Sequence, residues 1–410
     1  MKVLLVNKFH YVKGGSETYY FGLGELLRQN GVEVVCFSMQ DEKNIPCEQE
    51  KYFVSHIDFN AEMGLFQKIK AGLNMLYSRE AKKKFEQLIK DEKPDIVHLN
   101  IFQSHLTGSI VDVAKKYKIP IVYTAHDLKS VCPDYRMLSH GQICEKCLSG
   151  DYKNCFRSGC MKDSKLKSLL ATLEAYEYKR RKIYQKIDLV ITPSAFYKEK
   201  IEQSGVMACP IVHIPNFLPV GTEYKASGVK GEYFLYFGRL SREKGVLTLL
   251  DAYERANVDL PLYIVGTGPE EEAIQERVEK LNGKEKVRLL GFRQGEELKG
   301  LVKNSRCVIL PSEWYENGPY SVMEAMAAGK PAIVSNLGGL PELVEDGVTG
   351  YVVSAFDAAA LGAAMEKVER LSDEALSAMG KAAAEKAREK FDGSKYVEEL
   401  LQKYEELIER

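Results

Sequence analysis

Short, continuous apolar runs alternate with longer amphipathic stretches along the whole chain. Such runs, apolar at every position, are typical of parallel strands buried on both faces. The predicted strands are residues 2–6, 32–38, 94–99, 119–123, 188–192, 211–214, 233–237, 262–265, 287–290, 307–310 and 332–334. Helical patterns lie between them, among others over residues 61–93 and 164–186. Strands that alternate with helices predict an α/β fold with parallel sheets.

The length and the linker pattern predict two domains. A chain of 410 residues exceeds the usual size of one hydrophobic core. Residues 218–231 are rich in glycine and polar residues, as interdomain linkers are. We therefore expect a first domain over residues 1–217, a second over 218–392, and a final amphipathic helix over 393–410.

The most informative stretch follows the strand at residues 307–310. A loop leads from there into a helix that begins at about Tyr320. Glu316 lies in the loop, at the carboxyl end of the strand, where open α/β sheets bind ligands. Glu324 lies about one turn into the helix, within reach of the same crevice. Both carboxylates can accept hydrogen bonds from sugar hydroxyls, although two glutamates alone also fit a solvated acidic loop.

Two glycine-containing turns suit phosphate. The strand at residues 233–237 runs into Gly238 and Arg239, and Lys244 follows. Arginine can bind a diphosphate bidentately and lysine as a point charge, whereas the alternative is a solvated basic loop. Gly14 and Gly15 open the first helix, whose amide groups could meet a phosphate. That signal is weak alone, because glycines also serve plain tight turns.

These stretches resemble the retaining glycosyltransferases of family 4, which have the GT-B fold, and especially those of bacterial cell-surface polysaccharides. The resemblance covers nearly the whole chain and is more specific in the second half. The residues that carry it are Gly14-Gly15-Ser16-Glu17, His126-Asp127, Pro215-Asn216, Gly238-Arg239, Lys244-Gly245, Pro311-Ser312, Glu316, Glu324, Gly329, Pro331, Gly338-Gly339, Asp346-Gly347 and Gly350.

The resemblance implies two Rossmann-like domains, an acceptor-side first domain and a second domain that binds a nucleotide-diphosphate sugar. It also implies that the last helix, residues 393–410, packs back on the first domain. It implies retaining transfer of a hexosyl group to a saccharide or lipid-linked saccharide in surface polysaccharide synthesis. The implied catalytic residues are Glu316, His126, Arg239 and Lys244. The implied donor-binding residues are Gly14, Gly15, Gly238, Gly266, Gly268, Gly291, Phe292, Asn317, Gly318, Tyr320, Ser321 and Glu324.

One departure from the family pattern concerns the loop after Glu316. The family often has Gly-Phe-Gly there, whereas this chain has Asn317, Gly318 and Pro319. Proline has no N–H group, so one amide contact to the sugar is lost. The identity of the donor sugar is therefore open.

Three alternative functions remain open from the sequence. A sugar-nucleotide epimerase shares the GT-B architecture, but the spacing of the two glutamates and His126-Asp127 argue against it. A dinucleotide-dependent oxidoreductase would carry Gly-x-Gly-x-x-Gly where this chain has Gly14-Gly15-Ser16-Glu17. A non-catalytic sugar-nucleotide-binding protein is the third. A single histidine is more often structural than functional. His126 follows the carboxyl end of a predicted strand, where ligand-binding residues collect, and this place favours a functional role.

Net charge and apolar runs indicate which partners and which cellular location to expect. The formal net charge is −1, so no overall field attracts nucleic acid. Arg239, Lys244 and helix N-termini can stabilise a diphosphate leaving group, so we expect catalysis without a cofactor. The apolar run at residues 1–6 is too short for a signal peptide and predicts a first strand, and no segment reaches the ~20 apolar residues of a membrane span. We expect a cytoplasmic protein.

Cysteines cluster in a loop-rich insertion over residues 128–163. In a reducing compartment such clustering favours metal over disulfides. Cys144 with Cys147, and Cys155 with Cys160, have spacings that suit a structural zinc site, and Cys132 is a fifth candidate. The alternative is a set of unpaired thiols in a loop.

Lysines and arginines gather in the first domain. They are Lys82, Lys83, Lys84, Lys115, Lys116, Lys165, Lys167 and residues 179–182. Solvated helix faces explain most such runs. The alternative is a patch that rests on an anionic membrane surface, where each cation contributes ~1 kcal/mol. The protein would then be peripheral on the inner face of the cell membrane.

Overall fold

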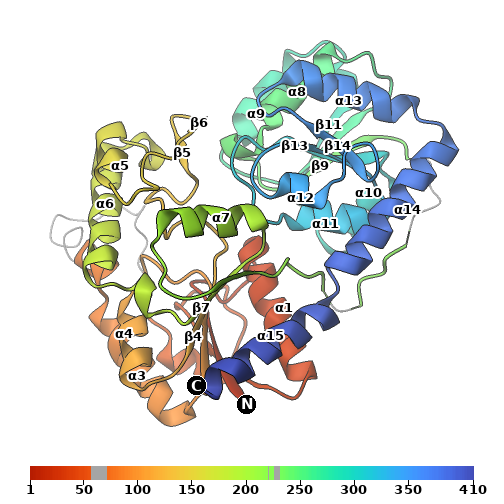
Figure 1. Ribbon diagram of the computed structural model, residues 1–410. Helices are drawn as coiled ribbons and strands as arrows, with labels where there is room; N and C mark the ends of the chain where they lie inside the picture. The colour runs from red at the N-terminus through yellow and green to blue at the C-terminus, as the bar shows by residue number, and fades with distance from the viewer. Residues whose placement is uncertain (57–71, 220, 226–230) are drawn as a thin grey trace. The chain divides into compact units, whose positions relative to one another are not determined.

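The computed structural model describes residues 1–56, 72–219, 221–225 and 231–410 (Figure 1). The chain divides into two compact units. Unit 1 comprises Met1–Asn216 and Gly393–Arg410, and unit 2 comprises Phe217–Asp392. Each unit contains a six-stranded parallel sheet, which confirms the predicted α/β class. No helix in the described ranges is long and apolar enough to cross a bilayer.

The sheet of unit 1 has the strand order β2-β1-β3-β4-β7-β8. Its strands are β1 (Lys2–Val6), β2 (Glu33–Phe37), β3 (Ile96–Leu99), β4 (Ile121–Thr124), β7 (Leu189–Thr192) and β8 (Ile211–His213). Every residue of β3, β4 and β7 is buried, as expected for strands covered on both faces. The topology changes direction between β1 and β3, so the loops after these strands flank a crevice.

Helices cover the sheet of unit 1 (Figure 1). They are α1 (Gly15–Gln29), α3 (Arg79–Glu92), α4 (Ser109–Lys116), α5 (Lys153–Ser158), α6 (Lys165–Arg180), α7 (Ala195–Ser204) and α15 (Gly393–Ile408). Serine side chains accept backbone N–H groups at the starts of α3, α6 and α7. Such caps satisfy amides that have no partner within the helix, which explains where these helices begin.

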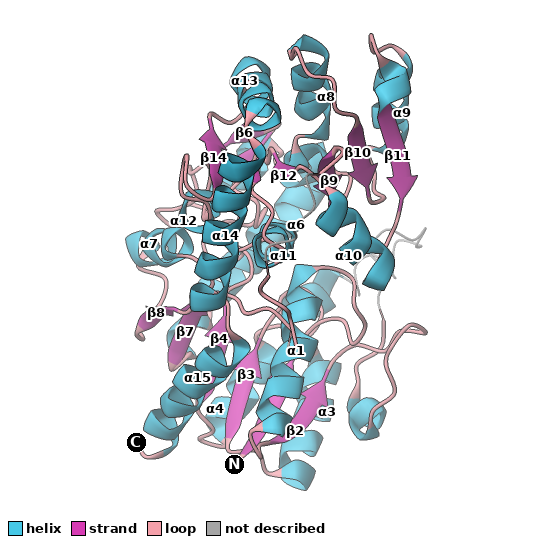
Figure 2. Cartoon of the chain, turned by 90° about the vertical axis from the view of Figure 1, so that its right-hand side faces the viewer, coloured by secondary structure: helices cyan, strands magenta, loops and turns pink. Residues whose placement is uncertain are grey.

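The C-terminal helix α15 belongs to unit 1, although it follows unit 2 in the sequence. It lies beside α1 (Figure 2). Tyr396, Val397, Leu400 and Tyr404 form its buried face. Their spacing of three to four residues places them on one side of the helix.

The sheet of unit 2 has the order β11-β10-β9-β12-β13-β14. Its strands are β9 (Phe234–Phe237), β10 (Leu262–Val265), β11 (Val287–Gly291), β12 (Cys307–Leu310), β13 (Ala332–Ser335) and β14 (Gly350–Val353). Its helices are α8 (Val246–Arg255), α9 (Glu271–Glu279), α10 (Gly295–Asn304), α11 (Tyr320–Ala327), α12 (Leu340–Leu343), α13 (Ala358–Arg370) and α14 (Asp373–Lys390). This strand order is that of a dinucleotide-binding Rossmann sheet.

The elements that the sequence did not predict are short or lie at an edge. The strand β14 is half-buried at the edge of its sheet, so its apolar pattern is weak. The insertion at residues 128–163 contains α5 and a hairpin of β5 (Leu138–Ser139) and β6 (Gln142–Ile143). Short 3₁₀ turns span Glu48–Tyr52, Met161–Asp163, Tyr184–Lys186, Arg242–Lys244 and Lys284–Lys286.

The long helix predicted over residues 61–93 is only partly present. Residues 72–76 are helical, and α3 begins at Arg79 after the capping residue Ser78. The cap explains the break, because its side chain accepts the N–H of Ala81 and thereby starts a new helix. Residues 57–71 lie outside the described part of the chain.

Candidate active site

The carboxyl edge of the unit 2 sheet brings the two charged loops together. The strand β9 lies between β10 and β12, so its two neighbours continue the sheet in opposite directions. Ligands of open α/β sheets bind outside the strand ends at such a switch point. The loop after β9 carries Arg239 and Lys244, and the loop after β12 carries Glu316.

Lys244 and Glu316 form an ion pair at this switch point. The Lys244 Nζ lies 2.6 Å from Glu316 Oε1. Ser312 donates a hydrogen bond to the same oxygen at 2.5 Å. The Glu316 side chain is only 5% exposed, and that of Lys244 is 19% exposed. Two residues far apart in the sequence therefore form one partly desolvated ion pair. The Lys244 Nζ also lies 5.4 Å from the centroid of the Trp314 ring.

Two glycines allow the loops to approach this closely. At Gly245, with φ +68°, a Cβ atom would lie 2.0 Å from the carbonyl oxygen of Pro311. At Gly338, with φ +62°, a Cβ atom would lie 2.3 Å from the carbonyl oxygen of Glu316. The same oxygen accepts the N–H of Gly339 at 2.7 Å. Any side chain at Gly245 or Gly338 would displace the backbone that positions Glu316.

The loops after β9, β10 and β11 are joined by backbone hydrogen bonds. Gly238 donates its N–H to Val265 O at 3.0 Å, and Gly266 donates to Gly291 O at 2.8 Å. Gly268 follows on the same loop, packed against the backbone of Leu240. Beside this framework, Arg239 and Phe292 are exposed. The structure therefore places these predicted donor residues along one edge of unit 2, with a cation and an aromatic ring available to a ligand.

The helix α11 contributes the second glutamate. It begins after Pro319, with no side-chain cap, and Tyr320 and Ser321 form its first turn. Asn317 and Gly318 lie in the loop just before it. Burial raises the pKa of Glu324 to about 7, while Lys299 lowers it slightly. Glu324 is therefore poised to change its protonation state near neutral pH.

In unit 1, His126 lies just past the carboxyl end of β4. Its Nε2 donates to Asn100 Oδ1 at 2.9 Å, and its ring lies 4.7 Å from the ring of Tyr19. Burial lowers the pKa of His126 to about 3, so its imidazole is neutral at physiological pH. The adjacent Asp127 accepts the N–H of Lys129, and burial raises its pKa to about 6.

A buried hydrogen-bond network lies next to His126 and joins β4, α1, β3 and α15. Thr124 Oγ1 contacts Tyr19 OH at 3.0 Å and His98 Nε2 at 2.7 Å. His98 Nδ1 in turn contacts the hydroxyl of Tyr404 on α15. The Tyr19 hydroxyl also contacts that of Tyr396, about two turns earlier on α15. The C-terminal helix α15 thus contacts α1 through Tyr19 and β3 through His98. His126 in turn contacts the Tyr19 ring and Asn100, the residue after β3.

The start of α1 in unit 1 positions a further carboxylate, which the sequence analysis named as part of the family resemblance but not as a site residue. Gly14 precedes α1 and Gly15 begins it, so both lie at its start, as predicted. Glu17 follows in the first turn and is 4% exposed. Its Oε1 accepts hydrogen bonds from Asn7 Nδ2 at 3.1 Å and Ser16 Oγ at 3.0 Å. The signal was its place two residues after the glycine pair, at the start of a predicted helix.

The predicted zinc site finds no support. Among the described residues, no group of three or more His, Cys, Asp or Glu side chains is placed to hold a metal ion. Cys147, Cys155 and Cys160 instead pack with Tyr152 in a small apolar cluster against α6. Cys132 is buried as a free thiol, and Cys144 is half-buried outside that cluster. Buried cysteine behaves as a small hydrophobic residue, so the insertion has a core of its own.

Comparisons with known sequences agree across both units. The family described as Glycosyltransferase Family 4 matches residues 13–221, and the family described as Glycosyl transferases group 1 matches residues 223–386. A putative colanic acid biosynthesis glycosyltransferase, WcaL of Salmonella typhimurium, is 30% identical over 176 residues, which are 41% of this chain and 43% of that protein. The match thus spans less than half the length of that relative.

A second relative matches over a longer stretch. A Klebsiella pneumoniae protein, described as an uncharacterized 42.6 kDa protein in cps region, is 24% identical over 356 residues, 84% of this chain and 87% of that protein.

Solved structures share the whole architecture. Anabaena HepE in complex with UDP-glucose superposes with a TM-score of 0.70 at 18% identity, over 99% of this chain and 100% of that chain. Sucrose-phosphate synthase from Thermosynechococcus elongatus gives 0.73 at 20% identity, over 99% and 98%. At such identities the likeness concerns the fold, and it confirms the predicted GT-B class. The family matches to both units and this shared fold show that the chain belongs to glycosyltransferase family 4.

Proposed function

We propose that this protein transfers a hexosyl group from a nucleotide-diphosphate sugar to a saccharide or lipid-linked saccharide, in the synthesis of a surface polysaccharide. The observation that carries the proposal is the Lys244–Glu316 pair at the switch point of unit 2. The relatives add support, since one is described as a putative colanic acid biosynthesis glycosyltransferase. Anabaena HepE, which has the same fold, has been crystallised with UDP-glucose.

In this proposal, unit 2 binds the donor. The exposed guanidinium of Arg239 and the ammonium of Lys244 bind the diphosphate, whose negative charge grows as the sugar leaves. Glu316 accepts hydroxyl groups of the hexose, and Ser312 keeps its carboxylate oriented. Glu324 accepts the hydroxyl groups of the ribose. These two cations supply the charge stabilisation that the departing diphosphate needs, so we propose that catalysis is independent of a metal ion.

Unit 1 contributes the acceptor side and His126. Because the imidazole is neutral, it serves as a hydrogen-bonding group for the donor sugar and not as a cation for the phosphate. We further propose that the configuration at the anomeric carbon is retained. The acceptor hydroxyl would attack from the face that the diphosphate leaves, and a diphosphate oxygen would take its proton.

The test is a reaction of the purified protein with a panel of nucleotide sugars and saccharide acceptors. Mass spectrometry should detect a nucleoside diphosphate together with a glycosylated acceptor. The anomeric coupling constant in the NMR spectrum of the product then shows whether the configuration of the donor sugar is retained. An epimerised sugar formed without an acceptor would replace this proposal with the epimerase alternative. Tight binding of a sugar nucleotide without turnover on any acceptor would favour the non-catalytic binder.

A further inference from the structure

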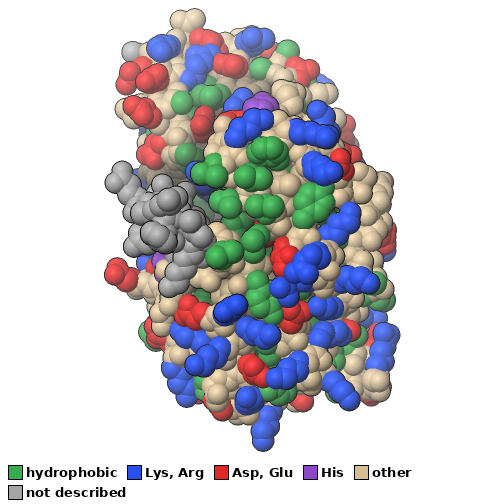
Figure 3. Space-filling view, turned by 90° about the vertical axis from the view of Figure 1, so that its left-hand side faces the viewer, with side chains coloured by type: hydrophobic (Ala, Val, Ile, Leu, Met, Phe, Trp, Pro, Cys, Tyr) green, Lys and Arg blue, Asp and Glu red, His purple; other side chains and the backbone are tan. Residues whose placement is uncertain are grey.

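The helix α6 exposes its leucines and buries its polar residues. Leu166, Leu169 and Leu173 are 64%, 36% and 44% exposed. Their spacing of three and four residues places them on one face of the helix. A soluble helix normally turns such a stripe toward the core, so this one needs a separate explanation. Figure 3 shows hydrophobic side chains gathered on the face of the molecule that carries α5 and α6.

The inward face of α6 is held by polar contacts. Ser168 Oγ accepts the N–H of Met161 at 3.0 Å, and Thr172 Oγ1 donates to Tyr152 O at 3.3 Å. Glu174 lies 2.9 Å from the Lys129 ammonium, with only 2% of its side chain exposed. A rotation that buried the leucines would expose this face and leave these polar groups without their partners. The outward leucine stripe is therefore fixed by the fold.

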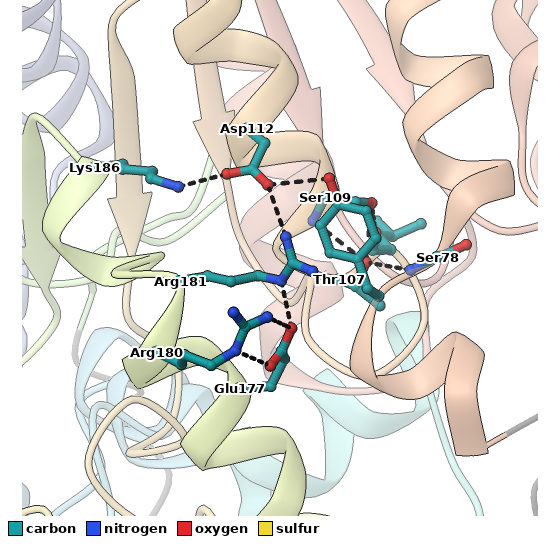
Figure 4. A network of polar contacts seen from close by, with 10 residues as sticks. Ser78, Thr107, Ser109, Asp112, Glu177, Arg180, Arg181 and Lys186 are labelled. Atoms are coloured by element: carbon teal, nitrogen blue, oxygen red, sulfur yellow. Dashed lines mark hydrogen bonds and ion pairs between the residues drawn. The ribbon is translucent and has the colours of Figure 1, made fainter.

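Both ends of α6 are also fixed. Ser164 caps its start through the N–H of Lys167. At its end, Glu177 binds Arg180 and Arg181, and the Asp112 side chain on α4 lies 4.0 Å from Arg181 and 2.6 Å from Lys186 (Figure 4). The leucines thus stand on a helix that is anchored to the core of unit 1.

The surface around the leucines is cationic. Residues 153–182 contain nine Lys and Arg residues and three Asp and Glu residues, although the whole chain has a net charge of −1. Lys153 and Arg157 on α5, and Lys165 and Lys167 on α6, are exposed and have no carboxylate partner among the described residues. Phe156 on α5 is 41% exposed, and the Lys165 ammonium at the start of α6 lies 5.8 Å from the centroid of its ring.

Several lysines expected to form a membrane patch are neutralised instead. Lys116 pairs with Glu86 at 2.6 Å, and Lys115 pairs with Asp188 at 2.7 Å. Lys84 pairs with Glu80 at 3.1 Å. Paired surface charges contribute little to an external field. Of the cations expected in that patch, Lys165 and Lys167 on α6 have no carboxylate partner among the described residues, and the same holds for Lys82 and Lys83 on α3.

We propose that the leucine face of α6, comprising Phe156, Leu166, Leu169 and Leu173 with the cations around it, docks on an anionic phospholipid bilayer. Leucines that enter the interface and cations that meet lipid phosphates are the two contributions that interfacial binding needs. The stripe is apolar and has exposed lysines beside it, so it offers both contributions. The inference rests on the proposed function for its purpose, because docking would bring unit 1 to a lipid-linked acceptor.

The experiment is co-sedimentation of the full chain with vesicles of phosphatidylcholine, alone or mixed with phosphatidylglycerol. Binding should require phosphatidylglycerol and weaken as salt is added. Leu169→Asp and Leu173→Asp should each reduce binding at least about tenfold, since each removes one leucine from the interface. Lys165→Glu with Lys167→Glu should reduce binding by a similar factor.

The matched control is Ile408→Asp, at an exposed apolar residue on α15, away from this face. It should bind vesicles as the wild type does. All variants should keep the wild-type melting temperature and the rate of transfer to a water-soluble acceptor, because the leucines lie outside the site. A wild-type protein that binds vesicles but transfers no sugar to any acceptor would overturn the proposed function, while the docking proposal would still hold.

Three results would overturn the docking proposal. One is a wild-type protein that stays in the supernatant with anionic vesicles at low salt. Another is binding that survives both leucine substitutions. The last is a dimer in light scattering that Leu169→Asp dissociates, which would make this face a contact between two copies of the chain.

Discussion

The ion pair between Lys244 and Glu316 allows a prediction that separates stability from catalysis. Lys244→Ala removes the cation that faces a carboxylate whose side chain is 5% exposed. Breaking a fully buried pair costs ~3–5 kcal/mol, because the remaining charge is uncompensated. Here the lysine is 19% exposed and Ser312 still donates to Glu316, so we expect a loss of ~1–3 kcal/mol in the free energy of unfolding.

Catalysis should fall by more than this change in stability explains. The same lysine is proposed to stabilise the diphosphate, and removal of one such contact typically lowers the rate ~10²–10³-fold. Chemical denaturation measures the first quantity, and release of nucleoside diphosphate with a glycosylated acceptor measures the second. Arg242→Ala is the matched control, since it removes an exposed cation from the same loop and should change neither quantity appreciably.

The double variant tests the reasoning further. Glu316→Gln removes the charge that Lys244→Ala leaves unpaired, so the double variant should be more stable than the sum of the single effects predicts, by ~1–2 kcal/mol. Its transfer rate should be as low as that of the worse single variant. Additive stability losses, or near-normal transfer by Lys244→Ala at normal stability, would refute the assignment of this pair.

Three further predictions follow from the site. Burial raises the pKa of Glu324 to about 7, so the affinity for the donor should weaken as the pH falls below about 7, because the ribose hydroxyls need the ionised carboxylate. Glu324→Gln should bind the donor weakly at every pH. Titration calorimetry measures both affinities, and a wild-type affinity that does not change between pH 6 and pH 8 would contradict this role of Glu324. Tyr404→Phe removes the hydroxyl that contacts His98 and should lower the free energy of unfolding by ~1–2 kcal/mol, measured by urea denaturation; a neutral effect would mean that water replaces it. Gly338→Ala should lower the melting temperature and abolish transfer, because its Cβ would lie 2.3 Å from the carbonyl oxygen of Glu316, and a variant with normal transfer would contradict the close approach of the loops.

The sequence by itself determined the fold class and predicted which residues lie at the strand ends of the candidate site. Strands buried on both faces are continuous apolar runs, a local signal that needs no knowledge of what covers them. Glycine turns, cations and glutamates after those runs must lie at the carboxyl edge of a parallel sheet, whatever the details of packing. The family resemblance then supplied roles for residues such as Glu316 and Lys244.

The tertiary structure decided which of these groups touch and which faces are exposed. No local pattern shows that Lys244 pairs with Glu316, or that Tyr404 reaches His98 from the far end of the chain. The cysteines illustrate the same limit, because spacing alone cannot distinguish metal ligands from thiols that pack with Tyr152. In α6 the usual inference from periodicity is reversed. Its leucine stripe is typical of a core-facing helix, but Ser168, Thr172 and Glu174 contact Met161, Tyr152 and Lys129 outside the helix, and these contacts turn the leucines outward. Periodicity defines a stripe, and only long-range contacts decide whether protein, water or another surface covers it.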